Sequence, residues 1–393
     1  MRPGPWLRLT AIGGAAGTLV AVVSGTASLG TGHQVLAALA LPPLAAVVVL
    51  AWTSYRRLLV PSLTALVLFG LAAVVTAPGI HLALAALAFS ASLVSAALTF
   101  RGEPVPIGSA RDYLTLTKPR IMTLLLLTGL CGMVVGAGGL PPLWLVATTM
   151  LGLALACGGA SALNHVLDAD IDRLMGKRTR SRPVAAGRIP ESYALEFGLA
   201  LSALSFVLLA GVVNVLTALL ALFGILFYVL VYTKLLKRST PQNIVIGGAA
   251  GAIPPLVGWA AATGSLTLPA LVLFAVVFLW TPPHFWALAL LIKRDYANAG
   301  VPMLPVVRGE RETVKEILLY TAGLVAFTLA PALWGQFGLF YLVAAALLGA
   351  VFLGLAWNLR RERTPARAAL LFHYSLAYLA LLFVAMALDT VIA

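Results

Sequence analysis

Long apolar runs follow one another along almost the whole chain, and each has about the length of a membrane-spanning helix. A helix of about 20 mostly apolar residues crosses the hydrocarbon core of a bilayer. The runs lack the alternation of apolar and polar residues that a membrane β-barrel requires. The pattern therefore predicts an all-α membrane protein with thirteen spans. These are residues 10–30, 34–53, 58–77, 79–100, 121–139, 143–166, 191–213, 215–233, 243–263, 268–291, 315–334, 337–358 and 369–391.

Basic residues occupy alternate connections between the apolar runs. The connections at 101–120, 173–188 and 234–238 each carry several Lys or Arg residues, whereas the turns near Gly139 and Gly264 carry none. Lys and Arg accumulate in cytoplasmic loops. We therefore expect a multi-pass protein of the cell (inner) membrane, with the N-terminus inside, the C-terminus outside and the polar loops facing the cytoplasm.

The composition excludes other classes of protein. Hydrophobic residues make up 61% of the 393 residues and charged residues only 10%, which excludes a soluble domain. The net charge of +13 is explained by basic loops beside anionic lipid, so no nucleic-acid partner is expected. Cys131 and Cys157 both lie in apolar runs, which supports neither a disulfide framework nor a cysteine metal site.

The connection at residues 101–120 is the longest, and it contains both proline and charged residues. It divides the chain into two predicted domains. Residues 1–105 form a four-helix transmembrane extension, and residues 106–393 form a nine-helix bundle.

The densest group of polar residues comes directly after an apolar run, where Asn164, Asp168 and Asp172 recur every four residues. If the helix continues, these three side chains share one face. Two carboxylates and an amide are too few to fill an octahedral Mg²⁺ shell, which leaves room for substrate phosphates. Guanidinium groups that bind phosphate oxygens follow between Arg173 and Arg182. The stretch predicts a magnesium–phosphate site, and the alternative is a charged loop that keeps a helix end in water.

Two further polar stretches face the same side. Residues 232–243 contain several cations, which either contact phosphate or only follow the positive-inside rule. The sixth helix of the bundle contains Pro282 and Pro283, which are expected to break or kink it, and then His284. Asp295 follows His284 by eleven residues, so on a continuous helix both share one face about 16 Å apart. His284 has the alternative of a hydrogen-bonded interior residue.

These motifs resemble those of the intramembrane polyprenyl-diphosphate transferases, and within them the heme O synthases (protoheme IX farnesyltransferases). The resemblance begins at Asp112 and covers roughly 280 residues, and its most discriminating segment runs from His284 to Pro305. Quinone and chlorophyll prenyltransferases usually have a second Asp-x₃-Asp pair, whereas Asp295 stands alone here. The resemblance therefore favours the heme branch.

The resemblance implies nine helices around a central cavity in which farnesyl diphosphate is bound through Mg²⁺. It implies heme B as the acceptor, whose vinyl group becomes the hydroxyethylfarnesyl group of heme O for respiratory oxidases. His284 is then expected to contact the porphyrin. The expected metal ligands and catalytic residues are Asn164, Asp168, Asp172 and Asp295, and the expected diphosphate ligands are Arg178, Arg182, Lys234 and Lys237.

The four-helix extension lies outside that resemblance. His33 and His81 begin its second and fourth helices. This spacing resembles one half of heme A synthase, where a histidine pair ligates heme, although two histidines at helix boundaries also arise by chance. We expect His33 and His81 to ligate heme, and we expect heme A synthase or oxidase assembly factors as partners.

Two other functions compete with this interpretation. One is a prenyltransferase of the same fold that acts on an aromatic or quinone precursor. The other is a heme or ion transporter, for which polar groups near mid-membrane on several helices would be typical. In the enzyme, Asp168→Asn and Asp172→Asn should abolish most turnover and leave folding largely intact, because both carboxylates are expected at the water boundary.

Overall fold

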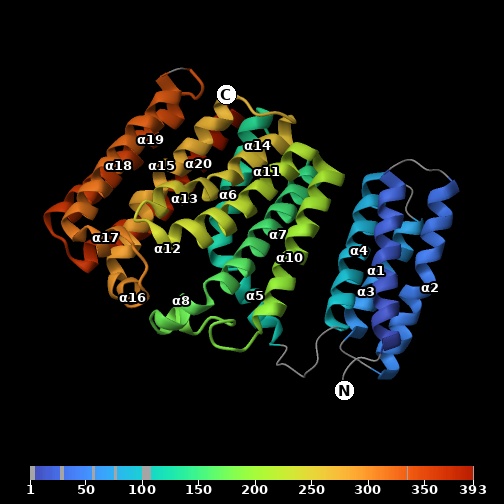
Figure 1. Ribbon diagram of the computed structural model, residues 1–393. Coiled ribbons are helices and arrows are strands. Elements are labelled where there is room, and N and C mark those ends of the chain that lie inside the picture. Colours follow the sequence, from blue (N-terminus) through green and yellow to red (C-terminus); the bar gives the residue numbers. More distant parts are fainter. Residues whose placement is uncertain are drawn as a thin grey trace.

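The computed structural model describes residues 5–26, 31–54, 58–74, 78–99, 108–333 and 335–392. Every regular element within these ranges is a helix, which confirms the all-α membrane class (Figure 1). Among the described residues, eleven helices are long and apolar enough to cross a bilayer, and two shorter apolar stretches lie at Pro61–Ala73 and Leu84–Ala96. Each predicted run is largely helical over its described residues, while the count of thirteen spans and their orientation stay predictions.

The first four helices, which we call the extension, pack against one another. They are α1 (Pro5–Thr26), α2 (Thr31–Ser54), α3 (Leu59–Val74) and α4 (Pro78–Thr99). Small residues bring them close together, since a Cβ atom on Gly17 would lie 3.0 Å from Ala40 Cβ. Thr18 and Ser92 add a buried hydrogen bond of 2.8 Å between α1 and α4.

The remaining helices form what we call the large bundle. Its largest buried apolar cluster takes more residues from α15, α19 and α20 than from other helices, and α7, α14 and α18 contribute to it as well. The large bundle comprises α5 (Ala110–Leu116), α6 (Pro119–Ala137), α7 (Leu143–Leu167), α8 (Ala169–Leu174), α9 (Lys177–Arg180), α10 (Glu191–Leu208), η2 (Leu209–Val213), α11 (Val215–Leu226), η3 (Phe227–Leu236), α12 (Lys237–Ser239), α13 (Asn243–Gly251), α14 (Ile253–Thr263), α15 (Leu268–Leu291), α16 (Lys293–Asn298), α17 (Leu304–Val307), α18 (Gly309–Leu333), α19 (Leu339–Arg361) and α20 (Pro365–Ile392).

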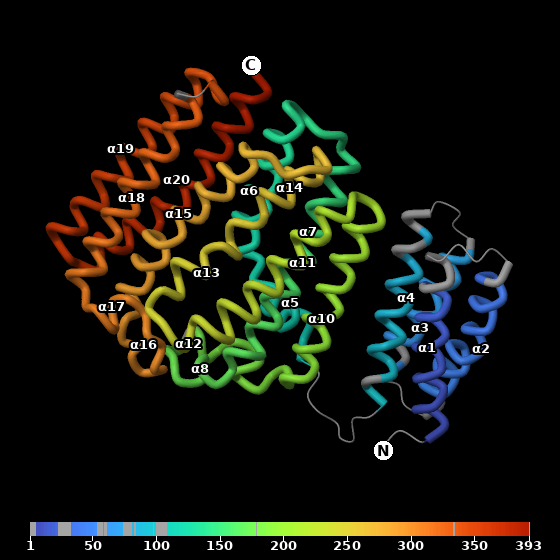
Figure 2. Tube along the Cα trace, turned by 45° about the horizontal axis from the view of Figure 1, so that its top comes forward, coloured from blue at the N-terminus to red at the C-terminus, as the bar shows by residue number. Residues whose placement is uncertain are grey.

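The extension contacts the large bundle through one side. Helix α4 lies beside α10 and η2, and both views place the extension next to α10 (Figures 1 and 2). The predicted domain boundary at residues 105 and 106 lies outside the described residues.

Helix α15 corrects two expectations. It continues through Pro282 and Pro283, so a break at the prolines is excluded, whereas a kink there stays a prediction. Proline removes backbone donors, but this segment is enclosed by neighbouring helices and not exposed to lipid. The helix ends instead at Leu291, and Ile292 (φ −115°, ψ 30°) separates it from α16. His284 and Asp295 are therefore on two successive helices and not on one continuous helix, and their predicted separation of about 16 Å stays a prediction.

Glycine permits the close approach of α6 and α14. A Cβ atom on Gly258 would overlap the carbonyl oxygen of Gly129, and one on Gly132 would meet the carbonyl oxygen of Pro255. Backbone atoms cannot move aside as a flexible side chain can, so the two helices would have to separate.

We expect Gly258→Ala to lower the free energy of unfolding by about 2–3 kcal/mol, because the added methyl group overpacks this contact. Thermal unfolding in detergent measures the change. Gly354→Ala on α19 is the matched control, because a Cβ atom there meets nothing within 4 Å. Equal melting temperatures for the two variants would refute the close contact.

Candidate active site

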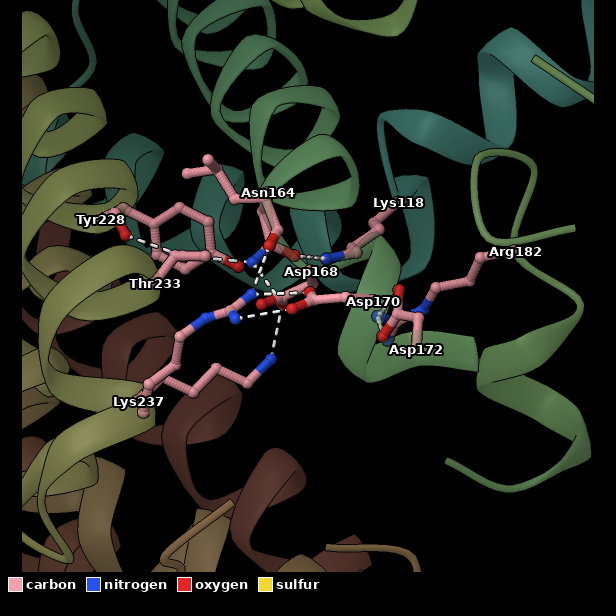
Figure 3. Close-up of polar contacts among 11 residues, drawn as sticks. Lys118, Asn164, Asp168, Asp170, Asp172, Arg182, Tyr228, Thr233 and Lys237 are labelled. Atoms are coloured by element: carbon pink, nitrogen blue, oxygen red, sulfur yellow. Dashed lines mark hydrogen bonds and ion pairs between the residues drawn. The ribbon is translucent and has the colours of Figure 1, made fainter. Parts of the chain in front are cut away.

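Polar side chains from four segments meet where α7 passes into α8 (Figure 3). The helix axis is interrupted at Asp168, yet the backbone bonds continue at a spacing of four residues. Asp168 N donates to Asn164 O at 2.9 Å, and Asp172 N donates to Asp168 O at 2.8 Å. This spacing keeps Asn164, Asp168 and Asp172 in sequence along one side of the turn.

Each carboxylate of the stripe is paired with one cation. Lys237 Nζ on α12 lies 2.5 Å from Asp168 Oδ2, which also accepts from Asn164 Nδ2 at 2.8 Å. Arg182 Nη1 donates to both oxygens of Asp172, at 2.7 and 2.8 Å. Both carboxylates are 1% exposed, so they do not lie at a water boundary as expected. Burial raises the pKa of Asp172, and the Arg182 guanidinium opposes that shift.

Asp295 reaches the same region from a separate segment. A Cβ atom on Gly176, in the α8–α9 connection, would contact the Asp295 carboxylate, whose Oδ1 lies 3.0 Å away. The neighbouring Tyr296 is buried, and its pKa is raised to about 12 by burial and by the charges of Asp168, Asp172 and Asp295. The carboxylate of α16 and the stripe of α7–α8 are therefore electrostatic neighbours.

Lys118 is a site residue that sequence analysis missed. Its Nζ donates to Asn164 Oδ1 at 2.7 Å. Its backbone is left-handed (φ 51°), which a non-glycine residue adopts at a cost, and Pro119 starts α6 directly after it. Burial, together with the Arg182 charge, lowers the pKa of Lys118 to about 7. The Lys-Pro pair at the start of a span was the only available signal.

Thr233 was also missed, and it lies in the π-helix η3. Asn164 Nδ2 donates to Thr233 Oγ1 at 3.1 Å, and Thr233 Oγ1 donates to Tyr228 O at 2.9 Å. π-Helical turns are rare and concentrate at functional sites. Two predicted diphosphate ligands lie in this segment or directly after it, and they differ in exposure. Lys237 is buried against Asp168, whereas Lys234 is exposed.

Two further predicted residues are Arg178 and His284. The side chain of Arg178 lies outside the described residues. His284 is buried between Trp280 and Phe372, with ring centroids 4.2 and 4.8 Å away, and its Nδ1 is 2.7 Å from Ser375 Oγ. These contacts agree with the alternative of a hydrogen-bonded interior histidine.

The donor set fits a hard divalent cation that shares its ligands with a phosphate. Asp168 Oδ1 is buried without a hydrogen-bond partner in the described structure, and a buried carboxylate oxygen is costly to leave unmatched. Among the described residues, no three His, Cys, Asp or Glu side chains stand close enough to hold an ion by themselves. Magnesium bound by one or two carboxylates plus substrate phosphates needs no such group.

A third ion pair, between Arg238 and Asp170, lies beside the cluster. Arg238 Nη1 and Nη2 each donate to one oxygen of Asp170 at 2.7 Å, and Nη2 also donates to Leu167 O at 2.5 Å. Because Asp170 lies between the stripe carboxylates and Arg238 follows Lys237, this pair sets α12 against the α7–α8 junction. The Arg238 hydrogen bonds also lower the pKa of Asp170 to about 2.

We expect Arg238→Gln to raise the KM for the diphosphate substrate predicted from the sequence roughly tenfold, because a shift of α12 displaces Lys237. Stability should change by less than about 1 kcal/mol, since the pair is half-exposed. The reversed pair Asp170→Arg/Arg238→Asp should restore the KM in part, as it keeps the ion pair but loses the bond to Leu167. Equal KM values for wild type and Arg238→Gln would refute the positioning role.

Known proteins match the chain over the large bundle. The UbiA prenyltransferase family matches residues 125–385. A protoheme IX farnesyltransferase of Symbiobacterium thermophilum is 56% identical over 281 residues, covering 71% of this chain and 94% of that protein. One from Roseiflexus sp. is 53% identical over 282 residues, covering 72% and 53%. One from Chloroflexus aurantiacus is 48% identical over 348 residues, covering 85% and 59%. The chain thus spans about half the length of the Roseiflexus relative.

Solved structures share the helix arrangement. A digeranylgeranylglyceryl phosphate synthase has a TM-score of 0.61 at 19% identity and covers 72% of this chain and 99% of its own. A UbiA homolog from Archaeoglobus fulgidus, bound to GPP and Mg²⁺, has a TM-score of 0.51 at 17% identity, covering 70% and 99%. At such identities the likeness shows the fold alone. The family match and the long, similar relatives decide the membership: the chain belongs to the UbiA prenyltransferase family.

Proposed function

We propose that this protein transfers a farnesyl group from farnesyl diphosphate to a vinyl group of heme B, which forms heme O. The observation that carries the proposal is the group of Asp168 and Asp172, each paired with a cation, and Lys118, with the Asp295 carboxylate packed against Gly176 in the connection that follows them. Relatives named protoheme IX farnesyltransferase, similar over nearly their full length in Symbiobacterium thermophilum, support the choice of acceptor.

The proposed reaction breaks the bond between farnesyl C1 and its diphosphate oxygen, and the diphosphate leaves with the electron pair. The terminal vinyl carbon bonds to C1, water adds its oxygen to the adjacent carbon, and one proton is lost. Mg²⁺, when bound, would stabilise the negative charge that develops on the leaving diphosphate. Asn164, Asp168, Asp172 and Asp295 would hold the ion.

The cations of the site have two roles in the proposed reaction, because they pair with the carboxylates and would also bind the diphosphate. Lys237 and Arg182 now neutralise Asp168 and Asp172. If the carboxylates held a metal ion, Lys237 and Arg182 would be free to bind diphosphate oxygens. Lys118 would join them in its protonated form. The scheme predicts that Mg²⁺ and diphosphate each bind more tightly in the presence of the other, and the predicted contacts of Lys234 and Arg178 remain part of the proposal.

The test is to incubate the purified protein with heme B, farnesyl diphosphate and Mg²⁺, and to weigh the porphyrin product by mass spectrometry. The expected product has the mass of heme B plus one farnesyl group and one hydroxyl group. A prenylated aromatic or quinone precursor, formed while heme B stays unchanged, would refute the proposal. The location of the site on the cytoplasmic side of the cell membrane belongs to the same proposal and is tested by cysteine accessibility at Lys177.

A heme site in the extension is a separate part of the proposal. The rings of His33 and His81 meet edge to face with centroids 5.7 Å apart. His81 Nδ1 is 2.7 Å from Ala72 O, and such a bond leaves Nε2 as the ligating nitrogen. The small cavity inside the extension, about 10 Å³, is far below porphyrin size, so a heme would have to bind at the end of the helices.

We expect the purified protein to show a low-spin spectrum typical of bis-imidazole heme ligation, and His33→Ala/His81→Ala to abolish it. The low-spin signature separates this heme from heme bound as substrate in the large bundle. An unchanged Soret spectrum in the double variant would exclude the pair as heme ligands.

A further inference from the structure

The connection between the stripe and Arg182 carries a pocket that the diphosphate site does not use. Lys177, Arg180 and Ser181 line an open pocket of about 420 Å³. The connection is fixed at both ends, since Gly176 packs against the Asp295 carboxylate and Arg182 pairs with Asp172. The pocket therefore lies on the rim of the diphosphate site.

The two cations of this pocket lack carboxylate partners. Neither Lys177 nor Arg180 forms an ion pair within the described part of the chain, whereas other arginines of the same connection do. Hydrogen bonds from two arginine side chains to backbone oxygens also hold the residues around the pocket. Arg180 Nε donates to Arg173 O at 3.1 Å, and Arg188 Nη2 donates to Ser181 O at 2.9 Å. Two exposed cations beside an open hollow suit a ligand with two negative charges.

We propose that this pocket, the Lys177–Arg180 pocket, binds the two propionate carboxylates of the porphyrin acceptor. The inference rests on the proposed function, because heme B is the acceptor there. Heme B carries both carboxylates on one edge and its vinyl groups on the opposite edge. Carboxylates are expensive to place in lipid, so they stay at the aqueous rim while the vinyl edge points toward the reacting farnesyl carbon. Cations at the rim then set the orientation of the ring.

The pocket gives the enzyme a way to choose among acceptors. A neutral quinone precursor has no carboxylate, and an aromatic acid has one, so neither fills both positions. Lys177 and Arg180 act on acceptor binding, and neither takes part in the ion pairs of Asp168 and Asp172. Removal of the pocket charges should change the KM for heme B and leave that for farnesyl diphosphate unchanged.

The experiment compares wild type with Lys177→Gln/Arg180→Gln in zwitterionic phosphatidylcholine nanodiscs, at saturating Mg²⁺. We expect the KM for heme B to rise about tenfold, with kcat and the KM for farnesyl diphosphate unchanged. The KM of wild type for heme B dimethyl ester should be as high as the KM of the double variant for heme B. Added salt should raise the KM of wild type more than that of the variant. Arg363→Gln, which removes an exposed cation from the α19–α20 connection, is the matched control.

Three results would overturn the inference. The first is an equal KM for heme B in wild type and in the double variant, and the second is a dimethyl ester that is as good a substrate as heme B. A KM effect that occurs only in nanodiscs containing phosphatidylglycerol would assign the pocket to lipid headgroups and also overturn it. Absence of any farnesyl transfer by wild type would instead refute the proposed function, so the two failures are distinguishable.

Discussion

Asp168→Asn is expected to lower kcat roughly 100- to 1,000-fold. The substitution keeps the size of the side chain and removes the charge that would hold a metal ion against the departing diphosphate. Asp168 Oδ1 is the buried carboxylate oxygen without a partner in the described structure, so it is the atom most available to a cation. Single-turnover formation of the farnesylated porphyrin, at saturating Mg²⁺, measures the change.

Stability has to be separated from chemistry in this variant. Asp168→Asn leaves Lys237 buried without its counter-ion, which costs about 3–5 kcal/mol. The expectation of largely intact folding therefore does not hold for Asp168→Asn alone. Asp168→Asn/Lys237→Met removes both charges and should recover most of the melting temperature without recovering turnover. Glu362→Gln, at an exposed carboxylate, is the control. Turnover near the wild-type rate in either Asp168 variant would contradict the proposed role.

Gly176→Ala is expected to lower kcat/KM for farnesyl diphosphate about 10- to 100-fold. The backbone at Gly176 (φ −60°, ψ 168°) suits alanine, so no backbone strain arises. The new methyl group would contact the Asp295 carboxylate and push it away from the stripe. A misplacement of about 1 Å is enough for an effect of this size.

The Mg²⁺ dependence makes the Gly176 prediction specific. We expect the Mg²⁺ concentration for half-maximal activity to rise in Gly176→Ala, while the melting temperature stays close to that of wild type. Gly251→Ala at the end of α13 is the matched control, because a Cβ atom there meets nothing within 4 Å. An unchanged Mg²⁺ dependence in Gly176→Ala would show that Asp295 takes no part in metal binding.

The sequence predicted those features that depend on local chemistry. Hydropathy located the helices, because a long apolar run has few other stable structures in lipid. The four-residue spacing of Asn164, Asp168 and Asp172 predicted their shared face, because backbone bonds keep that register through the turn at Asp168. Each of these two signals comes from residues within a few helical turns of one another.

Contacts between distant segments could not be predicted in this way. Lys118 bonds Asn164 across 46 residues, and Arg238 bonds Asp170 across 68. The different exposures of Lys234 and Lys237 depend on the π-helix η3, which apolar periodicity does not reveal. The continuity of α15 through Pro282 and Pro283 depends on the helices that enclose it, so the local rule for proline was misleading.

A structure of the protein bound to Mg²⁺ and a farnesyl thiodiphosphate, which resists transfer, measures the convergence of the two acidic segments directly. We predict Asp168 or Asp172 and Asp295 around the same metal-bound diphosphate, with Mg²⁺–oxygen distances of about 2.0–2.1 Å and with Lys237 and Arg182 moved onto the phosphate oxygens. A diphosphate bound without any contribution from Asp295, or one held away from α7–α8, would contradict it.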